Sequence, residues 1–276
     1  MASDETPSHI DRVFQDRDLV IEALRLGPRE AIARHQSRSH TSGDVSIPLG
    51  PEDFNEERTV KALVQWFEDR LAAIKACPAA ERPALLHRGP FKRFYEEMFP
   101  FVHFARHLYQ DRDDVTCFLN STSSSDRDYD AVIRDCSSTP STVTYVQLTT
   151  TTFDRDESRR MEYFLKHGWV PAWGQINEKG EVDLEIIELI DRNEKLTQTF
   201  GAIERAASRK ARFSHGLDYV LVVSFDDFMW FGTDDDRAAL RSFVCERLAA
   251  WRLNVAVLYV VGMSGRTFES FPVPRL

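Results

Sequence analysis

The stretch Asp128–Thr152 constrains the fold of this chain more than any other. Two short runs within it, Tyr129–Ile133 and Val143–Leu148, are rich in β-branched and aromatic residues, which favour strands. The segment between the two runs consists mainly of Asp, Cys, Ser, Thr and Pro, which are residues that form turns. The stretch therefore predicts a β-hairpin with a long connecting loop.

The same hairpin is expected to gather polar side chains on one face. Alternate side chains of a strand share a face, so Gln147 and Thr149 should point one way and Val146 and Leu148 the other. Asp130 lies early in the neighbouring strand. An acid and two polar groups can thus surround one point on the sheet.

Periodic patterns predict further elements on both sides of the hairpin. Apolar residues recur at three- and four-residue spacing in several segments, as in helices with one buried face. Short runs that are almost uniformly apolar indicate strands buried on both faces of a sheet. The residues after the last strand are interpreted as a Pro-containing tail. The predicted helices are Glu56–Ala76, Pro90–Tyr109 with a kink at Pro100, Asp156–His167, Asp183–Phe213 and Asp234–Trp251, and the predicted strands are Val115–Leu119, Tyr219–Phe225 and Val255–Val261.

This order of elements predicts an α/β protein, a three-layer α/β/α architecture around a central mixed sheet. Residues 1–55 are expected to form a polar N-terminal extension, with a helix over Arg12–Arg34 and a Ser-, Gly- and Pro-rich loop over Ser37–Pro51. Residues 56–276 are expected to form the α/β domain, with an insertion near residues 153–182.

From about Phe91 to Gly262, the order of elements resembles the PD-(D/E)XK nuclease superfamily, which has a restriction-endonuclease-like fold. That family places a metal-binding Asp on the second strand of a meander and Glu-x-Lys on the third. Asp130 matches the Asp, and Gln147-Leu148-Thr149 lies where Glu-x-Lys is expected. The chain thus resembles a divergent member with Gln-x-Thr in place of Glu-x-Lys.

The resemblance implies hydrolysis of a nucleic-acid phosphodiester with Mg²⁺, for which Mn²⁺ can substitute. The implied catalytic residues are Asp130, Gln147, Thr149 and a lysine supplied by the helix after the third strand. Lys210 is the favoured candidate for that lysine, and Lys195 is a weaker one. Cations near a helix C-terminus are also stabilised by the helix dipole, so Lys210 has an alternative explanation as a solvated helix end.

The implied metal ligands are Asp130, Gln147 and a Glu from the leading helix, taken as Glu97. Glu96 and Asp128 are further candidates for this second carboxylate. The alternative is that Glu96 and Glu97 are surface carboxylates that pair with Lys92 and Arg93 at helical spacing. A glutamine offers a neutral oxygen, so metal binding is expected to be weaker than with Asp and Glu together. Thr149 cannot carry the positive charge of a lysine.

His103 and His107 are four residues apart, which is a spacing found in zinc sites. No third ligand lies near them in the sequence, so histidines at the edge of the core are the favoured interpretation. The chain has no Gly-rich phosphate loop, no GxSxG and no HExxH motif. Nucleotide hydrolysis, serine-hydrolase and zinc-protease activities therefore have no support.

Composition limits the kinds of binding partner and the cellular compartment expected for this chain. The net charge of −9 argues against binding nucleic acid through the whole surface, but it permits a local basic groove. No apolar run approaches the ~20 residues that span a bilayer, and the first residues lack the features of a signal peptide. Four scattered cysteines without a CxxC pair suggest reduced thiols. A cytoplasmic protein that does not enter a membrane is therefore expected, and its oligomeric state is not predicted.

Three interpretations of function stay open. The chain is a divergent metal-dependent nuclease, or a catalytically inactive nuclease-like domain that binds nucleic acid or another protein. The third is an unrelated α/β fold in which the Tyr145–Thr149 strand is purely structural.

Overall fold

The computed structural model describes residues 49–120, 129–151, 155–167, 175–177, 182–183, 191–211, 216, 218–227 and 231–274. The predicted Arg12–Arg34 helix, Asp128 and nearly all of the N-terminal extension lie outside these residues. The chain divides into two compact units. One comprises residues 49–70, 87–153 and 189–276 and is called the sheet unit; the other comprises residues 1–48, 71–86 and 154–188.

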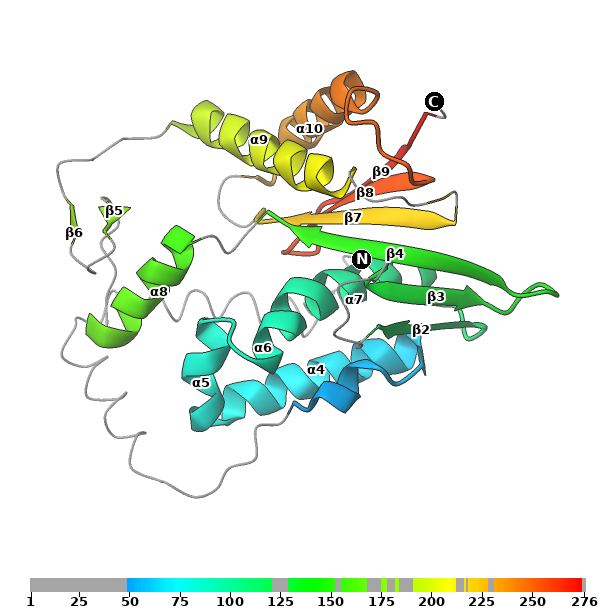
Figure 1. Cartoon of the computed structure of the whole chain (residues 1–276), viewed down its shortest axis with the longest axis horizontal. Helices are drawn as coiled ribbons and strands as arrows, with labels where there is room; N and C mark the ends of the chain where they lie inside the picture. The colour runs from blue at the N-terminus through cyan, green and yellow to red at the C-terminus, as the bar shows by residue number, and fades with distance from the viewer. Residues whose placement is uncertain are drawn as a thin grey trace, which may run out of the picture. The chain divides into compact units, whose positions relative to one another are not determined.

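The sheet unit contains one seven-stranded mixed sheet with the order β1-β2-β3-β4-β7-β8-β9 (Figure 1). The strands β1 to β4 pair antiparallel, as the predicted hairpin requires. The strands β4, β7 and β8 run parallel, and β9 returns antiparallel along the edge. The bounds are β1 Arg58–Thr59, β2 Val115–Leu119, β3 Ala131–Asp135, β4 Thr142–Thr150, β7 Tyr219–Phe225, β8 Val257–Gly262 and β9 Phe268–Pro272.

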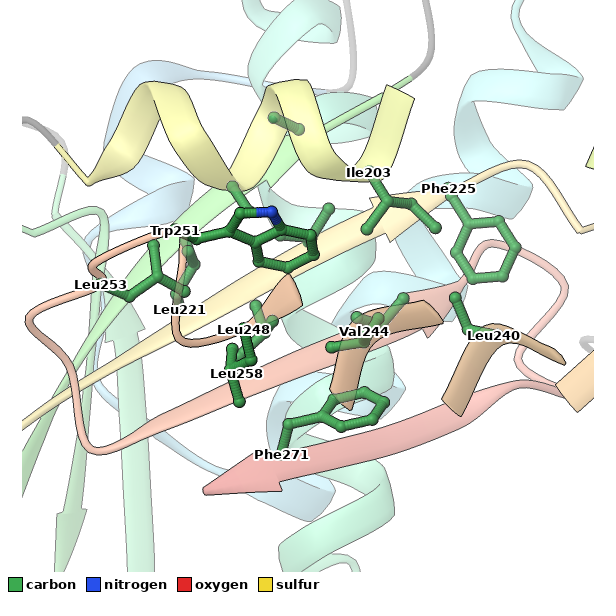
Figure 2. Close-up of a cluster of buried hydrophobic side chains, with 14 of the residues drawn as sticks. Ile203, Leu221, Phe225, Leu240, Val244, Leu248, Trp251, Leu253, Leu258 and Phe271 are labelled. Carbon is green, nitrogen blue, oxygen red and sulfur yellow. The ribbon is translucent and has the colours of Figure 1, made fainter. Parts of the chain in front are cut away.

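Two helices cover one face of the parallel strands (Figure 1). They are α9 (Arg192–Lys210) and α10 (Asp234–Arg247). Figure 2 shows Ile203 of α9 and Val244 of α10 in one buried cluster with Leu221 of β7 and Leu258 of β8. Because β7 is buried on both faces, its sequence is almost uniformly apolar rather than alternating.

Aromatic helices cover the opposite face of the sheet (Figure 1). Phe67 of α4 stacks on Phe94 with ring centroids 4.9 Å apart. Phe104 contacts Tyr259 of β8 edge-on, also at 4.9 Å. These contacts join the helices to one another and to the sheet. The elements are α4 Val60–Ala76, of which residues 60–70 belong to the sheet unit, α6 Pro90–Arg93, the π-helical turn η2 Phe94–Met98, and α7 Phe99–Tyr109.

The predicted Pro90–Tyr109 helix is divided as expected at its proline, although the break is broader than a simple kink. Pro100 lies in the first turn of α7, and the π-helical turn η2 precedes it. Proline has no N–H to donate to the carbonyl four residues earlier, so the backbone cannot continue a regular α-helix there. A π-helical turn accommodates this interruption.

Three predictions about element boundaries are wrong. The helix predicted from Asp183 begins at Arg192, where Asp191 accepts a hydrogen bond from the Glu194 N–H and caps the helix. Asp183 instead belongs to β6. The supposed C-terminal tail contains β9, which pairs with β8 as an edge strand where Pro272 is tolerated. No helix is predicted between Ala76 and Pro90, yet α5 begins at Pro78, which fits the first turn of a helix.

The other unit contains four described elements besides the end of α4. The predicted Asp156–His167 helix agrees with α8, and the Gly168 cap predicted for it lies outside the described residues. The strands β5 and β6 form a separate antiparallel pair. The bounds are α5 Pro78–Leu85, α8 Arg155–His167, β5 Gln175–Ile176 and β6 Val182–Asp183.

His103 of α7 is a buried histidine without a partner for its Nε2 atom among the described residues. Its ring contacts Phe99 at a centroid distance of 4.7 Å, and the side chain is 9% exposed. Burial, together with the smaller effect of the nearby charge of Arg106, lowers the pKa of His103 to about 4. The folded protein therefore holds this imidazole neutral at pH values where an exposed histidine takes up a proton.

Acid is expected to destabilise the fold through His103. Between pH 6.5 and about 4 the unfolded chain binds a proton that the folded chain excludes, so stability falls as the pH falls through this window. The shift corresponds to about 3 kcal/mol of unfolding free energy. Urea unfolding of wild type and His103→Gln at pH 7.5 and 4.5 measures it. A pH slope that is unchanged in the variant would contradict this assignment.

Candidate functional site

Asp130 lies directly before β3, beside β4. Ala131, the first residue of β3, pairs with Val146 of β4. The Asp130 N–H also donates to the Val146 carbonyl, at 2.9 Å, so both residues lie opposite Val146. Lys210 contacts the side chains of Asp130 and Gln147, so these two side chains approach one point, as the sequence analysis predicts.

Three side chains meet at this point. Asp130 Oδ2 accepts a hydrogen bond from the Leu148 N–H at 2.7 Å. Lys210 Nζ donates to Gln147 Oε1 at 2.7 Å and lies 3.5 Å from Asp130 Oδ2. We call these residues the Asp130–Gln147–Lys210 cluster. All three belong to the sheet unit.

The packing of α9 explains how Lys210 reaches the cluster. Gln147 pairs with Leu221, which faces α9, so Gln147 faces α9 as well. Ala206 and Ala207 are fully buried on the sheet-facing side of α9. Lys210 follows them by four and three residues, which places it on the same side, one turn nearer the C-terminus.

Lys195, the weaker candidate, lies near the opposite end of α9. It precedes Lys210 by fifteen positions in one continuous helix, which corresponds to about 22 Å along the axis. Of the two lysines considered, the structure therefore brings Lys210 to Asp130 and Gln147.

The cluster lies in a partly water-excluded environment. The Gln147 residue is 3% exposed, while the side chains of Asp130 and Lys210 are 26% and 22% exposed. A buried amide oxygen needs a hydrogen bond, and the Lys210 ammonium supplies a charge-assisted one. The partial exposure of Asp130 and Lys210 leaves the charged edge of the cluster open to solvent.

Thr149 shares the face of Gln147 but does not join the cluster. Its partner in the register is Val223, and its carbonyl accepts a hydrogen bond from Ser224 Oγ at 3.4 Å. The threonine is half-buried. It therefore occupies the position of the expected lysine in the strand, while Lys210 brings the ammonium group from the helix.

Glu97 and Glu96 lie on η2, and both have basic neighbours. Glu97 Oε2 accepts from Arg93 Nε at 3.0 Å, which is the helical pairing that the alternative interpretation predicts. Glu96 Oε1 lies 3.5 Å from His87 Nδ1. The role of Glu97 as a metal ligand stays a prediction.

Arg93 connects this helical turn to the end of β2, which the sequence analysis did not anticipate. Its guanidinium donates to the Asn120 carbonyl, and the Asn120 N–H donates to the Asp130 carbonyl at 2.9 Å. The only signal in the sequence is that Asn120 directly follows a predicted strand. The backbone of Asp130 is thus hydrogen-bonded to residues on both sides, Asn120 after β2 and Val146 of β4.

Asp130 and Gln147 are the two residues of the cluster that could hold a cation with a preference for hard oxygen ligands. The contacts of the Asp130 carboxylate with Leu148 and Lys210 both use Oδ2, and Gln147 adds an amide oxygen. Among the described residues, no group of three or more His, Cys, Asp and Glu side chains could hold a metal ion. Mg²⁺ nevertheless binds through one or two carboxylates when waters and substrate phosphates complete its shell. The donor set therefore fits a weak site that depends on substrate.

The two spaced histidines make aromatic contacts instead. His103 is buried beside Phe99, and the His107 ring stacks on Phe268 with centroids 3.7 Å apart. These contacts agree with histidines at the edge of the core. The cysteines Cys77 and Cys117 are buried, and Cys136 and Cys245 are exposed, all as free thiols.

Comparison with family models, with curated proteins and with solved structures finds no match for this chain. Among the described residues, no helix combines the length and apolar character that crossing a membrane requires. The interpretation of the site therefore depends on its own geometry and chemistry.

Proposed function

We propose that this protein hydrolyses phosphodiester bonds of nucleic acid with Mg²⁺, through a divergent PD-(D/E)XK-like site. The observation that carries the proposal is the position of Lys210. Its ammonium nitrogen lies 2.7 Å from Gln147 Oε1 and 3.5 Å from Asp130 Oδ2, although it comes from a different element than the lysine of the motif. A helix that supplies a lysine beside an aspartate would compensate for the Gln-x-Thr strand.

The arrangement of elements supports the restriction-endonuclease-like part of the proposal. An antiparallel meander β2–β3–β4 is followed, after α8, β5 and β6, by α9 and by the parallel strand β7 on the side of β4. The strands β1, β8 and β9 extend this core to seven strands. The extra strands lie at the two edges of the sheet, so they leave the proposed site between β3, β4 and α9 unchanged.

Asp130, Gln147 and Lys210 would have different roles in the reaction. Asp130 and Gln147 would hold the cation, which when bound polarises the phosphate and lowers the pKa of a water molecule. Lys210 lies beside both oxygens, where its charge can orient an attacking water and stabilise the negative charge of the phosphate as it develops. A local positive charge is compatible with the negative net charge of the chain, since a nucleic acid contacts only one groove.

A second candidate function has one specific observation in its favour. In the cluster, Lys210 already neutralises the single carboxylate and satisfies the amide oxygen. An inactive nuclease-like domain that binds nucleic acid or another protein would keep such a contact for stability alone. Metal-dependent cleavage distinguishes the two functions directly.

Replacement of Lys210 by methionine is expected to reduce metal-dependent cleavage about 100-fold, because a group that stabilises transition-state charge contributes roughly 3 kcal/mol. Lys195→Met is the matched control, since the same substitution is made at the other end of the same helix. The assay follows end-labelled single-stranded DNA, duplex DNA and RNA with Mg²⁺, Mn²⁺ or EDTA.

Cleavage by wild type that EDTA abolishes, that Lys210→Met loses and that Lys195→Met retains would support the proposal. If wild type binds these nucleic acids but cleaves none of them with either metal, the inactive binding domain is the better description. Equal loss of activity in both lysine variants would show that Lys210 has no special role.

A further inference from the structure

Three tyrosines from neighbouring strands contact one another beside the Asp130–Gln147–Lys210 cluster: the Tyr145 and Tyr219 rings stack, and the Tyr129 ring is tilted against Tyr145. Tyr145 of β4 lies between Tyr129, which precedes β3, and Tyr219 of β7. The ring centroids are 4.8 Å apart for Tyr129 and Tyr145 and 5.0 Å apart for Tyr145 and Tyr219. We call this set the tyrosine ladder. Its members all belong to the sheet unit.

The register places Tyr145 and Tyr219 on the face that carries Gln147, and the ring contact of Tyr129 with Tyr145 brings Tyr129 to them. Tyr145 pairs with Tyr219, two residues before the pair of Gln147 and Leu221 in the same strands. Because alternate residues of a strand share a face, Tyr145 lies on the face of Gln147. Lys210, the last residue of α9, reaches Gln147. The ladder therefore lies where the sheet continues beyond the end of that helix.

Burial argues against a purely structural ladder. The three tyrosines are half-buried, whereas this chain fills its core with phenylalanine, as at Phe94, Phe104 and Phe225. Cross-strand aromatic pairs do stabilise sheets, but phenylalanine makes that contact equally well. Three of the seven tyrosines of the chain gather here, which favours a surface that keeps its hydroxyl groups in contact with solvent.

Tyr129 is the end of the ladder that adjoins the site. Its ring contacts Tyr145, while Tyr219 at the other end packs against the core beneath α9. Tyr145 lies two residues from Gln147 on the same face of β4, and Lys210 joins Gln147 to Asp130. A base stacked on Tyr129 would therefore lie near a group bound at the Asp130 carboxylate.

We propose that the tyrosine ladder is a stacking surface for unpaired bases, so that the substrate is single-stranded nucleic acid. This inference rests on the proposed function, because it places a phosphodiester at Asp130 and Lys210 and the adjoining base on Tyr129. Aromatic side chains bind single strands by stacking on bases, while cations bind the backbone. The half-buried Lys210 and the exposed Arg209 supply positive charge at the same end of α9. In a duplex the bases stack on one another, so their faces are not available to the ladder.

The test measures binding without cleavage. Fluorescence anisotropy in EDTA compares a labelled mixed-sequence oligonucleotide of DNA as a single strand and as a duplex. Wild type is expected to bind the single strand at least tenfold more tightly. Tyr129→Ala is expected to lose about 5- to 150-fold in single-strand affinity, the range that corresponds to one base–aromatic stack. Tyr129→Phe and Tyr129→Trp keep a π face and are expected to stay within about threefold of wild type.

Two outcomes would overturn the inference: equal affinity for single strand and duplex, or single-strand affinity in Tyr129→Ala equal to that of wild type. If the alanine variant does not fold, Tyr129→Leu replaces it, since leucine keeps apolar volume but offers no π face. Failure of the proposed function has a different signature. Single-strand preference that depends on Tyr129, without cleavage in Mg²⁺ or Mn²⁺, would support the stacking surface and reject hydrolysis. Metal-dependent cleavage without that preference would reject only the stacking surface.

Discussion

Replacement of Asp130 by alanine is expected to remove both metal binding and metal-dependent cleavage. Asp130 provides the carboxylate of the cluster, and Gln147 alone offers only a neutral oxygen. Loss of the charged ligand removes several kcal/mol of transition-state stabilisation, so the cleavage rate should fall by about 1,000-fold. Calorimetric titration with Mg²⁺ and Mn²⁺ in the presence of a non-hydrolysable oligonucleotide, together with cleavage rates, measures the two effects.

A second substitution at Asp130 distinguishes loss of metal binding from loss of stability. The Leu148 N–H donates to Asp130 Oδ2, so alanine also leaves a backbone donor without its acceptor. Asp130→Asn keeps an acceptor at that position but removes the charge, and it should lose activity with a smaller loss of stability. Asp135→Asn is the matched control, because Asp135 ends the same strand and pairs instead with Arg112 at 2.7 Å. Undiminished cleavage in Asp130→Asn would contradict a metal-binding role for Asp130.

The largest effect on stability is expected from Phe104. This side chain is 1% exposed and lies between α7 and the sheet, against Tyr259 and Phe268. Phe104→Ala removes its burial and leaves a cavity that close-packed neighbours fill only in part. The free energy of unfolding should fall by about 3–5 kcal/mol. Urea unfolding followed by circular dichroism measures the change.

Phe118 provides the comparison for this substitution. It is half-buried on β2, where it shares a face with Val132 rather than with the aromatic helices. Phe118→Ala should cost less, at about 1–2 kcal/mol, because less apolar surface returns to water. Equal losses in the two variants would show that the contact of α7 with the sheet is not the main stabilising layer on that face.

The strands predicted best from the sequence are those whose apolar residues are the ones buried in the sheet. Val115–Leu119 and Tyr219–Phe225 match β2 and β7 at both ends. Both consist mainly of residues that favour strands, so the local sequence is sufficient to predict them. The edge strand β9 was missed because a short segment with a proline has no such pattern, and only pairing with β8 makes it a strand.

Helix ends were less predictable, since caps depend on one or two residues. The hydroxyl of Thr233 accepts a hydrogen bond from the Asp236 N–H and caps α10. The start of α9 was misplaced because apolar residues before Asp191 continue a helical periodicity. The capping contact of Asp191 with Glu194 sets the boundary instead.

The sequence by itself determined the hairpin that brings Asp130 and Gln147 onto neighbouring strands, because strand alternation and hairpin pairing are local rules that act over a few residues. It favoured Lys210 over Lys195 but did not determine that either would reach these residues, since neither lysine is near the hairpin in the chain. Packing of Ile203, Ala206 and Ala207 against the sheet decided in favour of Lys210. Such a contact between residues eighty positions apart depends on how a helix docks on a sheet, which no short segment encodes.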